Sequence, residues 1–347
     1  MRTMVISVWV GVAVAATAGA SACAQTQLLE APAPLASDGG AGTDATLGED
    51  AAPGEPELVA KGISGALDIA VDDKYVYLAS MDAQSAFAVP KAGGEPILLG
   101  QHSSAVLGIT VDAARVYWGV AGVTNDSSAP GLIVSVPVAN LGAKPQTFKT
   151  STTFSAFSPW SLASDATHVY CGSANGVFAA DKESRAEIAL GGGQIPTPLV
   201  LTNDSVYWVA RLDGAILGSA KTGGGASTIV KGAPQAITGL AADEERVYWL
   251  ESDGPRGRVF SIPRSGGAKT ELASIGQSGY GMTVDAKYIY WTILAGGSVN
   301  RVPKAGGAAE LLAVNVVAPS LKGGAITQDA THVYWTTGEG NVFRLRK

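Results

Sequence analysis

Six aspartates occupy the same position in a phrase that recurs along this sequence, and six carboxylates could together bind a metal ion. Each stands five residues before a tyrosine, as in "DAARVYWG" from residue 112 and "DATHVYWT" from residue 329. They are Asp72, Asp112, Asp165, Asp243, Asp285 and Asp329, with Thr202 in the fourth copy. Carboxylates of a regular repeat lie far apart in space, whereas aspartate at a turn commonly accepts backbone N–H bonds. We therefore interpret them as turn residues and predict no metal site.

Familiar catalytic motifs are missing from the sequence. It has no HExxH or GxSxG motif, no EF-hand loop and no cluster of cysteine with histidine. We predict no catalytic residues and no cofactor, although residues of separate loops could still converge on one another. A non-catalytic role is favoured, and the question of enzymatic activity stays open at this stage.

The recurring phrase belongs to a repeat unit of four short strands. Its tyrosines are Tyr77, Tyr117, Tyr170, Tyr207, Tyr248, Tyr290 and Tyr334, at spacings of 40, 53, 37, 41, 42 and 44 residues. In the sixth copy the expected strands are "GMTV", "YIYWTI", "SVNRVP" and "AELLA". Seven strand-rich copies of this length indicate a radial repeat. The sequence thus predicts an all-β fold, a seven-bladed β-propeller of four-stranded antiparallel blades.

The "VYW" strand predicts how neighbouring blades pack. Alternate side chains of a strand point to opposite faces, so the valine and tryptophan should face one neighbouring blade and the tyrosine the other. The tryptophan position is filled by Leu78, Trp118, Cys171, Trp208, Trp249, Trp291 and Trp335. We expect these side chains to fill the space between blades, with Cys171 as a small buried apolar substitute.

The two ends of the repeat region predict how the ring closes. The last copy stops at "NVFRLRK" without a fourth strand, and "PELVAKG" from Pro56 is similar to the fourth strand "AELLA" at residues 309–313. An N-terminal strand should therefore complete the last blade, which removes free sheet edges.

The phrase "VYWT", with "VD" before it and "VPKAGG" after it, resembles the repeats of YWTD-type and TolB-like bacterial β-propellers. The resemblance covers residues 57–347. Several members of those families have six blades, whereas seven copies are present here. The implied fold hosts binding modules and enzymes alike. Hydrolases that this chain resembles bind calcium through acidic and amide side chains at the central channel, where the present sequence offers a single carboxylate, Asp68.

The N-terminus is typical of an exported lipoprotein. Residues 5–18 form an apolar stretch after Arg2, too short to span a bilayer comfortably. The "ASAC" of residues 20–23 resembles a bacterial lipobox, with alanine where leucine is usual, and predicts lipidation of Cys23. Ordinary cleavage after Ala22 or Ala24 is the alternative.

We therefore divide the chain into three parts. These are a signal peptide at residues 1–23, a disordered acidic tether rich in Ala, Gly and Pro at 24–56, and the propeller at 57–347. The protein would lie in the cell envelope, as an outer-membrane lipoprotein facing the periplasm or the surface, or otherwise be periplasmic or secreted. It would contact the membrane only through the N-terminal lipid.

Charge is distributed unevenly along the chain and excludes one class of partner. Of the net −6, residues 1–56 account for one basic and six acidic residues, which leaves 23 basic and 24 acidic residues in the remainder. A nearly neutral domain without a cluster of lysine and arginine argues against nucleic acid as a partner.

Candidate binding residues lie where the repeat departs from its own pattern. Residues five before each turn position should ring the channel mouth: Leu67, Leu107, Trp160, Thr197, Thr238, Tyr280 and Gly324. An insertion brings Phe154 and Phe157 near Trp160 in the sequence. We predict an aromatic patch of these three residues and Tyr280, suited to a peptide or a sugar. Alternatively, the rings only fill an uneven channel top.

Charged residues of the same face complete the set of candidates. They are Asp68, Arg211, Asp213, Asp253 and Arg256. The favoured function is a non-catalytic binding or scaffold module for an envelope protein, peptide or glycan. The alternatives are a hydrolase or lyase with its site at the channel mouth, and a purely structural lipoprotein.

Overall fold

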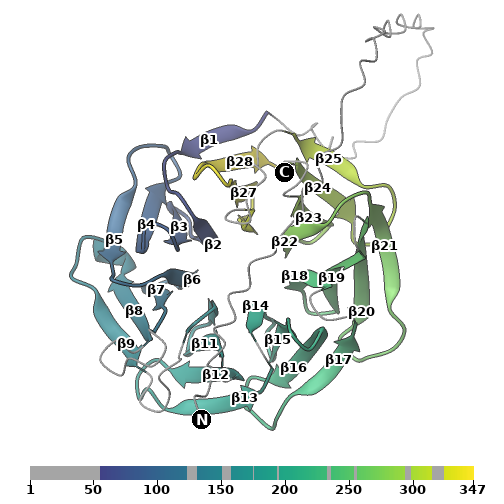
Figure 1. The fold of residues 1–347 in the computed structure, drawn as a ribbon, viewed down its shortest axis with the longest axis horizontal. Helices are drawn as coiled ribbons and strands as arrows, with labels where there is room; N and C mark the ends of the chain where they lie inside the picture. The colour runs from purple at the N-terminus through teal and green to yellow at the C-terminus, as the bar shows by residue number, and fades with distance from the viewer. Residues whose placement is uncertain are drawn as a thin grey trace, which may run out of the picture. The chain divides into compact units, whose positions relative to one another are not determined.

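The computed structural model describes residues 55–122, 131–150, 158–174, 176–193, 195–232, 236–253, 256–293, 298–314 and 324–347. Their strands form seven four-stranded antiparallel sheets arranged as blades around a central channel (Figure 1). This confirms the predicted seven-bladed β-propeller. The predicted signal peptide, Cys23 and nearly all of the tether lie outside the described residues.

Six blades are built from four strands that follow one another in the sequence, from the channel outwards, and the seventh takes its outermost strand from the start of the region. The innermost strands are β2 (Ala66–Val71), β6 (Val106–Val111), β10 (Ser161–Ser164), β14 (Pro196–Leu201), β18 (Ile237–Ala242), β22 (Gly279–Val284) and β26 (Ile326–Gln328). The second strands are β3 (Tyr75–Ser80), β7 (Arg115–Val120), β11 (His168–Ser173), β15 (Ser205–Ala210), β19 (Arg246–Asp253), β23 (Tyr288–Ile293) and β27 (His332–Thr336).

The outer half of each blade carries the third and fourth strands. The third strands are β4 (Ser85–Pro90), β8 (Leu132–Pro137), β12 (Gly176–Asp181), β16 (Ala215–Ala220), β20 (Arg256–Pro263), β24 (Ser298–Pro303) and β28 (Val342–Arg346). The fourth are β5 (Ile97–Gln101), β9 (Gln146–Thr150), β13 (Glu187–Gly191), β17 (Ser227–Lys231), β21 (Thr270–Ile275), β25 (Glu310–Ala313) and β1 (Glu57–Ala60). A short 3₁₀ helix, η1 (Val138–Asn140), follows β8.

The last blade joins the two ends of the repeat region. Its sheet order is β1-β28-β27-β26, so the first described strand lies at the outer edge of the blade that ends the chain. Leu58 pairs with Phe343, and Arg344 Nε donates to Glu57 Oε2 at 2.8 Å. This pairing fits the expected closure by an N-terminal strand.

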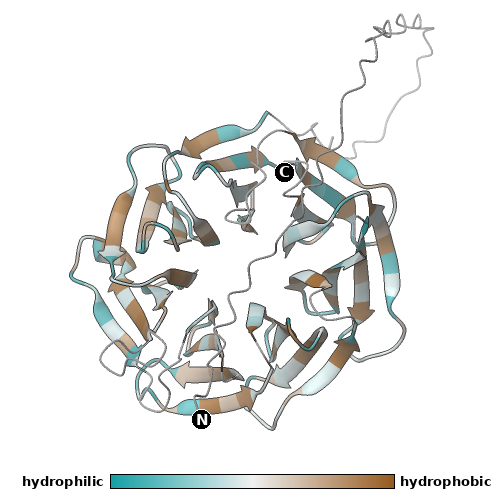
Figure 2. Cartoon of the chain, viewed as in Figure 1, coloured by the Kyte–Doolittle hydropathy of each residue, from teal (hydrophilic) through white to brown (hydrophobic). Residues whose placement is uncertain are grey.

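The contacts between blades follow the predicted alternation. Tyr77 of β3 is fully buried against Val116 and Trp118 of the next blade. The same arrangement recurs around the ring and returns to its start, where Tyr334 packs against Val76 and Leu78. Hydrophobic residues accordingly occur in the strands of all the blades (Figure 2). The second strands are therefore held by apolar packing on both faces.

Cys171 lies in this packing as predicted. Its side chain is fully buried beside Tyr117 and Val169, and burial raises the pKa of the thiol well above its ordinary value. The thiol is a small core group in the tryptophan position.

The six aspartates are turn residues, as predicted. At Asp72, Oδ1 accepts the backbone N–H groups of Lys74 and Tyr75, each at 2.7 Å, and Oδ2 accepts the hydroxyl of Tyr77 at 2.6 Å. The other five turns repeat the two backbone bonds. Each carboxylate thus anchors the tyrosine that packs against the next blade.

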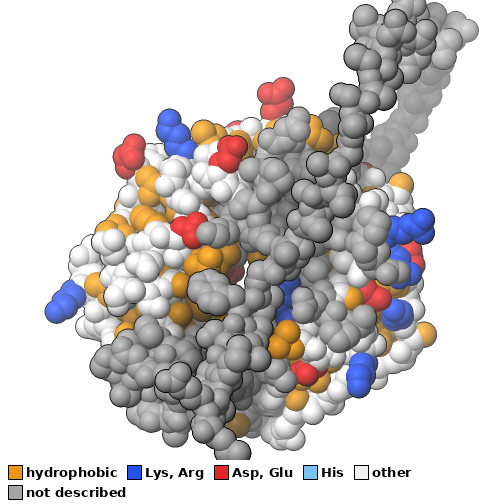
Figure 3. All heavy atoms as spheres, viewed as in Figure 1, with side chains coloured by type: hydrophobic (Ala, Val, Ile, Leu, Met, Phe, Trp, Pro, Cys, Tyr) orange, Lys and Arg blue, Asp and Glu red, His pale blue; other side chains and the backbone are white. Residues whose placement is uncertain are grey.

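Two further properties of the described residues bear on partners. No helix among them is long and apolar enough to cross a membrane. On the face shown in Figure 3, both acidic and basic side chains occur around the ring.

Truncating an inter-blade tryptophan should weaken the whole ring. We expect Trp249→Ala, at a fully buried indole, to lower the free energy of unfolding by about 3–5 kcal/mol because it opens a cavity in the core. Trp160→Ala, at an indole that is 36% exposed, should cost about 1 kcal/mol or less. Urea denaturation followed by circular dichroism measures both, and equal losses would contradict this packing scheme.

Candidate functional site

The inner strands begin at one end of the channel and enclose a cavity of about 280 Å³ there. Six of the seven residues expected to ring the mouth line this cavity: Leu67, Leu107, Trp160, Thr197, Thr238 and Tyr280. In the seventh blade Ala325 lines it in place of Gly324. The mouth is formed by corresponding positions of the repeat, which carry leucine, tryptophan, threonine or tyrosine in six of the blades.

Trp160 gives the mouth its largest exposed ring. The residue stands directly before β10, and its backbone N–H donates to the carbonyl of Gly172 on β11 at 2.9 Å. The indole is 36% exposed, whereas the five tryptophans between blades are completely buried. Trp160 therefore presents an aromatic surface to the cavity from a backbone that is held in place.

Arg211 brings a positive charge to the same cavity. It begins the turn between β15 and β16, which is closed by the N–H of Asp213 donating to Ala210 O at 3.1 Å. Its side chain is half-buried and lines the cavity, yet it forms no hydrogen bond or ion pair with any described residue. A guanidinium without such a contact is able to form a bidentate contact with a carboxylate or phosphate of a ligand.

Asp68 lies where two cavities of the channel meet. It lines both the mouth cavity and a second cavity of about 420 Å³ towards the other end. Its Oδ1 accepts the N–H of Ile69, and its Oδ2 accepts the N–H of Ile109 on the neighbouring blade, each at 2.9 Å. Burial outweighs these two bonds and raises the pKa of the carboxyl to about 6. Asp68 can therefore exchange a proton near neutral pH.

Tyr280 on β22 completes the polar groups of the mouth. Burial raises the pKa of its hydroxyl; the charge of Arg211 acts to lower it and that of Asp68 to raise it. The three side chains come from three different blades and act on one another electrostatically. Within the described residues, the mouth thus combines two aromatic rings, one cation and one carboxyl group.

The remaining predicted residues fall elsewhere. Asp213 and Arg256 are exposed and do not line the mouth cavity, and their role as binding residues of this face stays a prediction. The side chain of Asp253 lies outside the described residues, as do Phe154 and Phe157. No group of three or more metal-ligating side chains occurs in the described part of the chain.

Two features of the structure were missed by the sequence reasoning. Met282 and Leu240 extend the cavity inward, whereas the prediction considered only the mouth position of each blade and the residue after it. The lysine of "VPKAGG" also forms an ion pair that was not predicted, in which Lys91 Nζ lies 2.6 Å from Asp329 Oδ2 of the adjacent blade. The sequence signal for this ion pair was the recurrence of a lysine or arginine directly after most third strands.

Neither a protein-family model nor a curated protein matches the sequence. Solved structures do match. A catalytically inactive variant of virginiamycin B lyase from Staphylococcus aureus, solved with quinupristin, has a TM-score of 0.65 at 12% identity, over 84% of this chain and 98% of that chain. The WD40 β-propeller domain of Doa1 gives 0.66 at 14%, covering 84% and 97%.

A third match is YCF48 bound to the D1 peptide, with a TM-score of 0.63 at 8% identity, over 84% of this chain and 96% of that chain. At such identities these similarities show the fold alone, a β-propeller. The resemblance to YWTD-type and TolB-like repeats stays a prediction.

The titration of Asp68 can be tested directly. We expect its side-chain carboxyl, followed by ¹³C NMR with labelled aspartate and assigned with Asp68→Asn, to titrate with a midpoint of about 6. Because the folded-state pKa is raised, the ionised group disfavours the folded state. As the pH rises from about 4 to about 6, the free energy of unfolding of the wild type should therefore fall relative to that of Asp68→Asn. A midpoint near 4 would contradict the buried environment described here.

Proposed function

We propose that this protein is a non-catalytic binding module that holds a peptide or glycan of an envelope component at the channel mouth. The observation that carries the proposal is the mouth cavity, where an exposed indole, a half-buried phenol and a guanidinium without a described partner face one space. Trp160 and Tyr280 occupy positions where other blades have residues such as Leu67 or Thr197, so the repeat itself does not require these rings.

The size and chemistry of the cavity indicate the kind of ligand. About 280 Å³ is near the lower end of the range for small-molecule sites, which suits one side chain of a peptide or one sugar ring. An aromatic side chain can pack its ring face against a peptide side chain or against a sugar ring. Arg211 would add recognition of a carboxylate, such as the one that an acidic peptide or an acidic sugar carries.

The cellular address is part of the same proposal. The signal-like segment and Cys23 support an exported protein anchored by lipid, with the propeller held away from the membrane by residues 24–56. A binding partner would then belong to the cell envelope. The peptide complex of YCF48 shows that a propeller of similar fold can be a peptide-binding module.

A second candidate function is favoured by one observation. Asp68, with a pKa raised to about 6, lies at the base of the mouth cavity and could act as a general acid or base. Virginiamycin B lyase is an enzyme of similar fold. A lyase or hydrolase acting at the channel mouth is therefore the alternative, and loss of activity in Asp68→Asn with retained ligand binding would favour it.

The binding role is tested by cross-linking capture from intact cells, with captured proteins identified by mass spectrometry. We expect wild type to capture a partner that Trp160→Ala loses, because truncating a central aromatic anchor weakens binding by about 30-fold or more. Leu311→Ala is the control, since that side chain is exposed on the outer strand β25 and does not line the cavity. A partner retained by Trp160→Ala would place binding elsewhere. No partner in any sample would contradict protein binding and leave glycans as the ligand.

A further inference from the structure

A groove of about 400 Å³ lies at the boundary between the second and third blades. Its lining residues come from β7, β8 and β9 of the second blade and from turns of the third. Asp112 is among them, and it follows the end of β6 that lies away from Leu107 at the channel mouth. The groove is therefore separate from the proposed binding site.

Arg115 of β7 brings a positive charge to this groove. Its Nε donates to Ser135 Oγ at 3.0 Å, and its Nη2 donates to Ser135 O at 3.4 Å and to Gln146 Oε1 at 3.3 Å. All three acceptors are neutral, and Arg115 forms no ion pair with any described residue. The guanidinium is thus held in place while its charge lacks a carboxylate partner.

Arg185 brings a second cation to the groove from the third blade. Its Cζ lies 4.1 Å from the centroid of the Phe148 ring, and within the part of the chain that the structure describes it forms no ion pair. A guanidinium stacked on an aromatic face keeps the N–H groups at its edge available to an acceptor. Burial and the charge of Asp112 raise the pKa of the Tyr117 hydroxyl, and the charges of Arg115 and Arg185 both act to lower it. The two guanidiniums therefore act on the same small region.

The backbone at Arg185 indicates that the turn itself does not require an arginine. Arg185 stands three residues after the cation that follows the third strand, where four other blades have glycine: Gly94, Gly224, Gly267 and Gly307. The φ angle is 63° at Arg185 and 108–140° at these glycines. Side chains other than glycine disfavour positive φ, so folding of the turn does not account for this residue.

The other charges that line the groove compensate each other. Asp112 forms an ion pair with Lys182 of the third blade, so the groove retains the two positive charges of Arg115 and Arg185.

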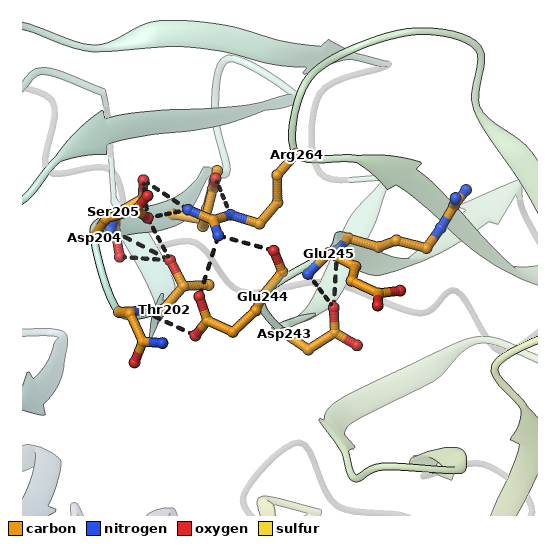
Figure 4. Close-up of polar contacts among 10 residues, drawn as sticks. Thr202, Asp204, Ser205, Asp243, Glu244, Glu245 and Arg264 are labelled. Carbon is orange, nitrogen blue, oxygen red and sulfur yellow. Dashed lines mark hydrogen bonds and ion pairs between the residues drawn. The ribbon is translucent and has the colours of Figure 1, made fainter.

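The boundary between the fourth and fifth blades shows an arginine whose charge is satisfied. Arg264 Nη1 lies 3.3 Å from Glu244 Oε2, and its Nη2 forms an ion pair with Asp204 (Figure 4). Its Nε donates to Tyr207 Oη at 3.0 Å. Among the described residues, no carboxylate reaches Arg115 or Arg185 in this way. An anion from outside the chain could therefore provide what Asp204 and Glu244 provide for Arg264.

We propose that this groove binds the phosphate group of a small phosphorylated molecule, with Arg115 and Arg185 as its two donors. A phosphate monoester carries a charge of about −1.5 to −2 near neutral pH and three acceptor oxygens, which match two guanidiniums. A carboxylate has a single charge, for which one guanidinium is sufficient. The volume of the groove lies within the range of small-molecule sites. This inference does not depend on what the channel mouth binds.

The test is isothermal titration calorimetry of the full chain with phenyl phosphate, beside benzoate, which has the same ring and a carboxylate. We expect saturable binding of phenyl phosphate, with benzoate weaker by about tenfold or more. Arg115→Gln and Arg185→Gly should each weaken phenyl phosphate binding by about tenfold or more, because each removes a charge-assisted contact. Arg185→Gly should keep a urea midpoint close to that of the wild type, since glycine suits a positive φ.

Arg246→Gln is the matched control for Arg115→Gln. Arg246 holds the equivalent place in the fifth blade, where its Nε donates to Ser261 Oγ at 3.1 Å, and the next blade has Gly307 in the position of Arg185. This variant should leave the affinity for phenyl phosphate unchanged.

Four results would overturn the proposal. They are no saturable binding by the wild type, equal affinity for benzoate, full affinity in Arg185→Gly, and loss of binding in Arg211→Ala, which would place the phosphate at the channel mouth.

Discussion

The contact on which this structure depends is the burial of one tyrosine per blade against the next blade. The tyrosine ring packs on the valine or isoleucine and the indole of its neighbour, and in most blades its hydroxyl donates to the carboxylate of its own turn. Apolar burial provides most of the driving force. The hydrogen bond fixes the direction of the ring, because a buried hydroxyl requires a partner. Seven such contacts in sequence close a ring.

This constraint separates the parts of the chain that can vary from those that cannot. The second strands are packed on both faces, so their side chains are determined by the neighbouring blades. The ends of the inner strands face the channel, where equivalent positions hold Leu67, Trp160 and Tyr280. Specific recognition can develop at the mouth without loss of packing. A second departure from the repeat follows β8, where Val138 takes the place of the lysine and the 3₁₀ helix η1 replaces the usual turn.

The same reasoning explains what could be predicted from the sequence. A repeat with alternating apolar residues specifies blade number, packing faces and the turn role of residues such as Asp285, because each copy supports the others. Positions at the mouth followed from counting along the repeat. The pKa of Asp68 did not, because it depends on burial by several blades and on the N–H of Ile109, 41 residues away. The partner of Lys91 was equally inaccessible, since Asp329 is 238 residues distant in the chain.

The central claim is that binding occurs at the channel mouth while the blades serve as its rigid support. Hydrogen–deuterium exchange of the propeller, alone and with a captured ligand, tests it most directly. The account predicts slower exchange confined to residues 66–68, 158–162, 209–214 and 279–282, with unchanged exchange in the outer strands. Protection of the outer strands, with none at the mouth, would contradict it.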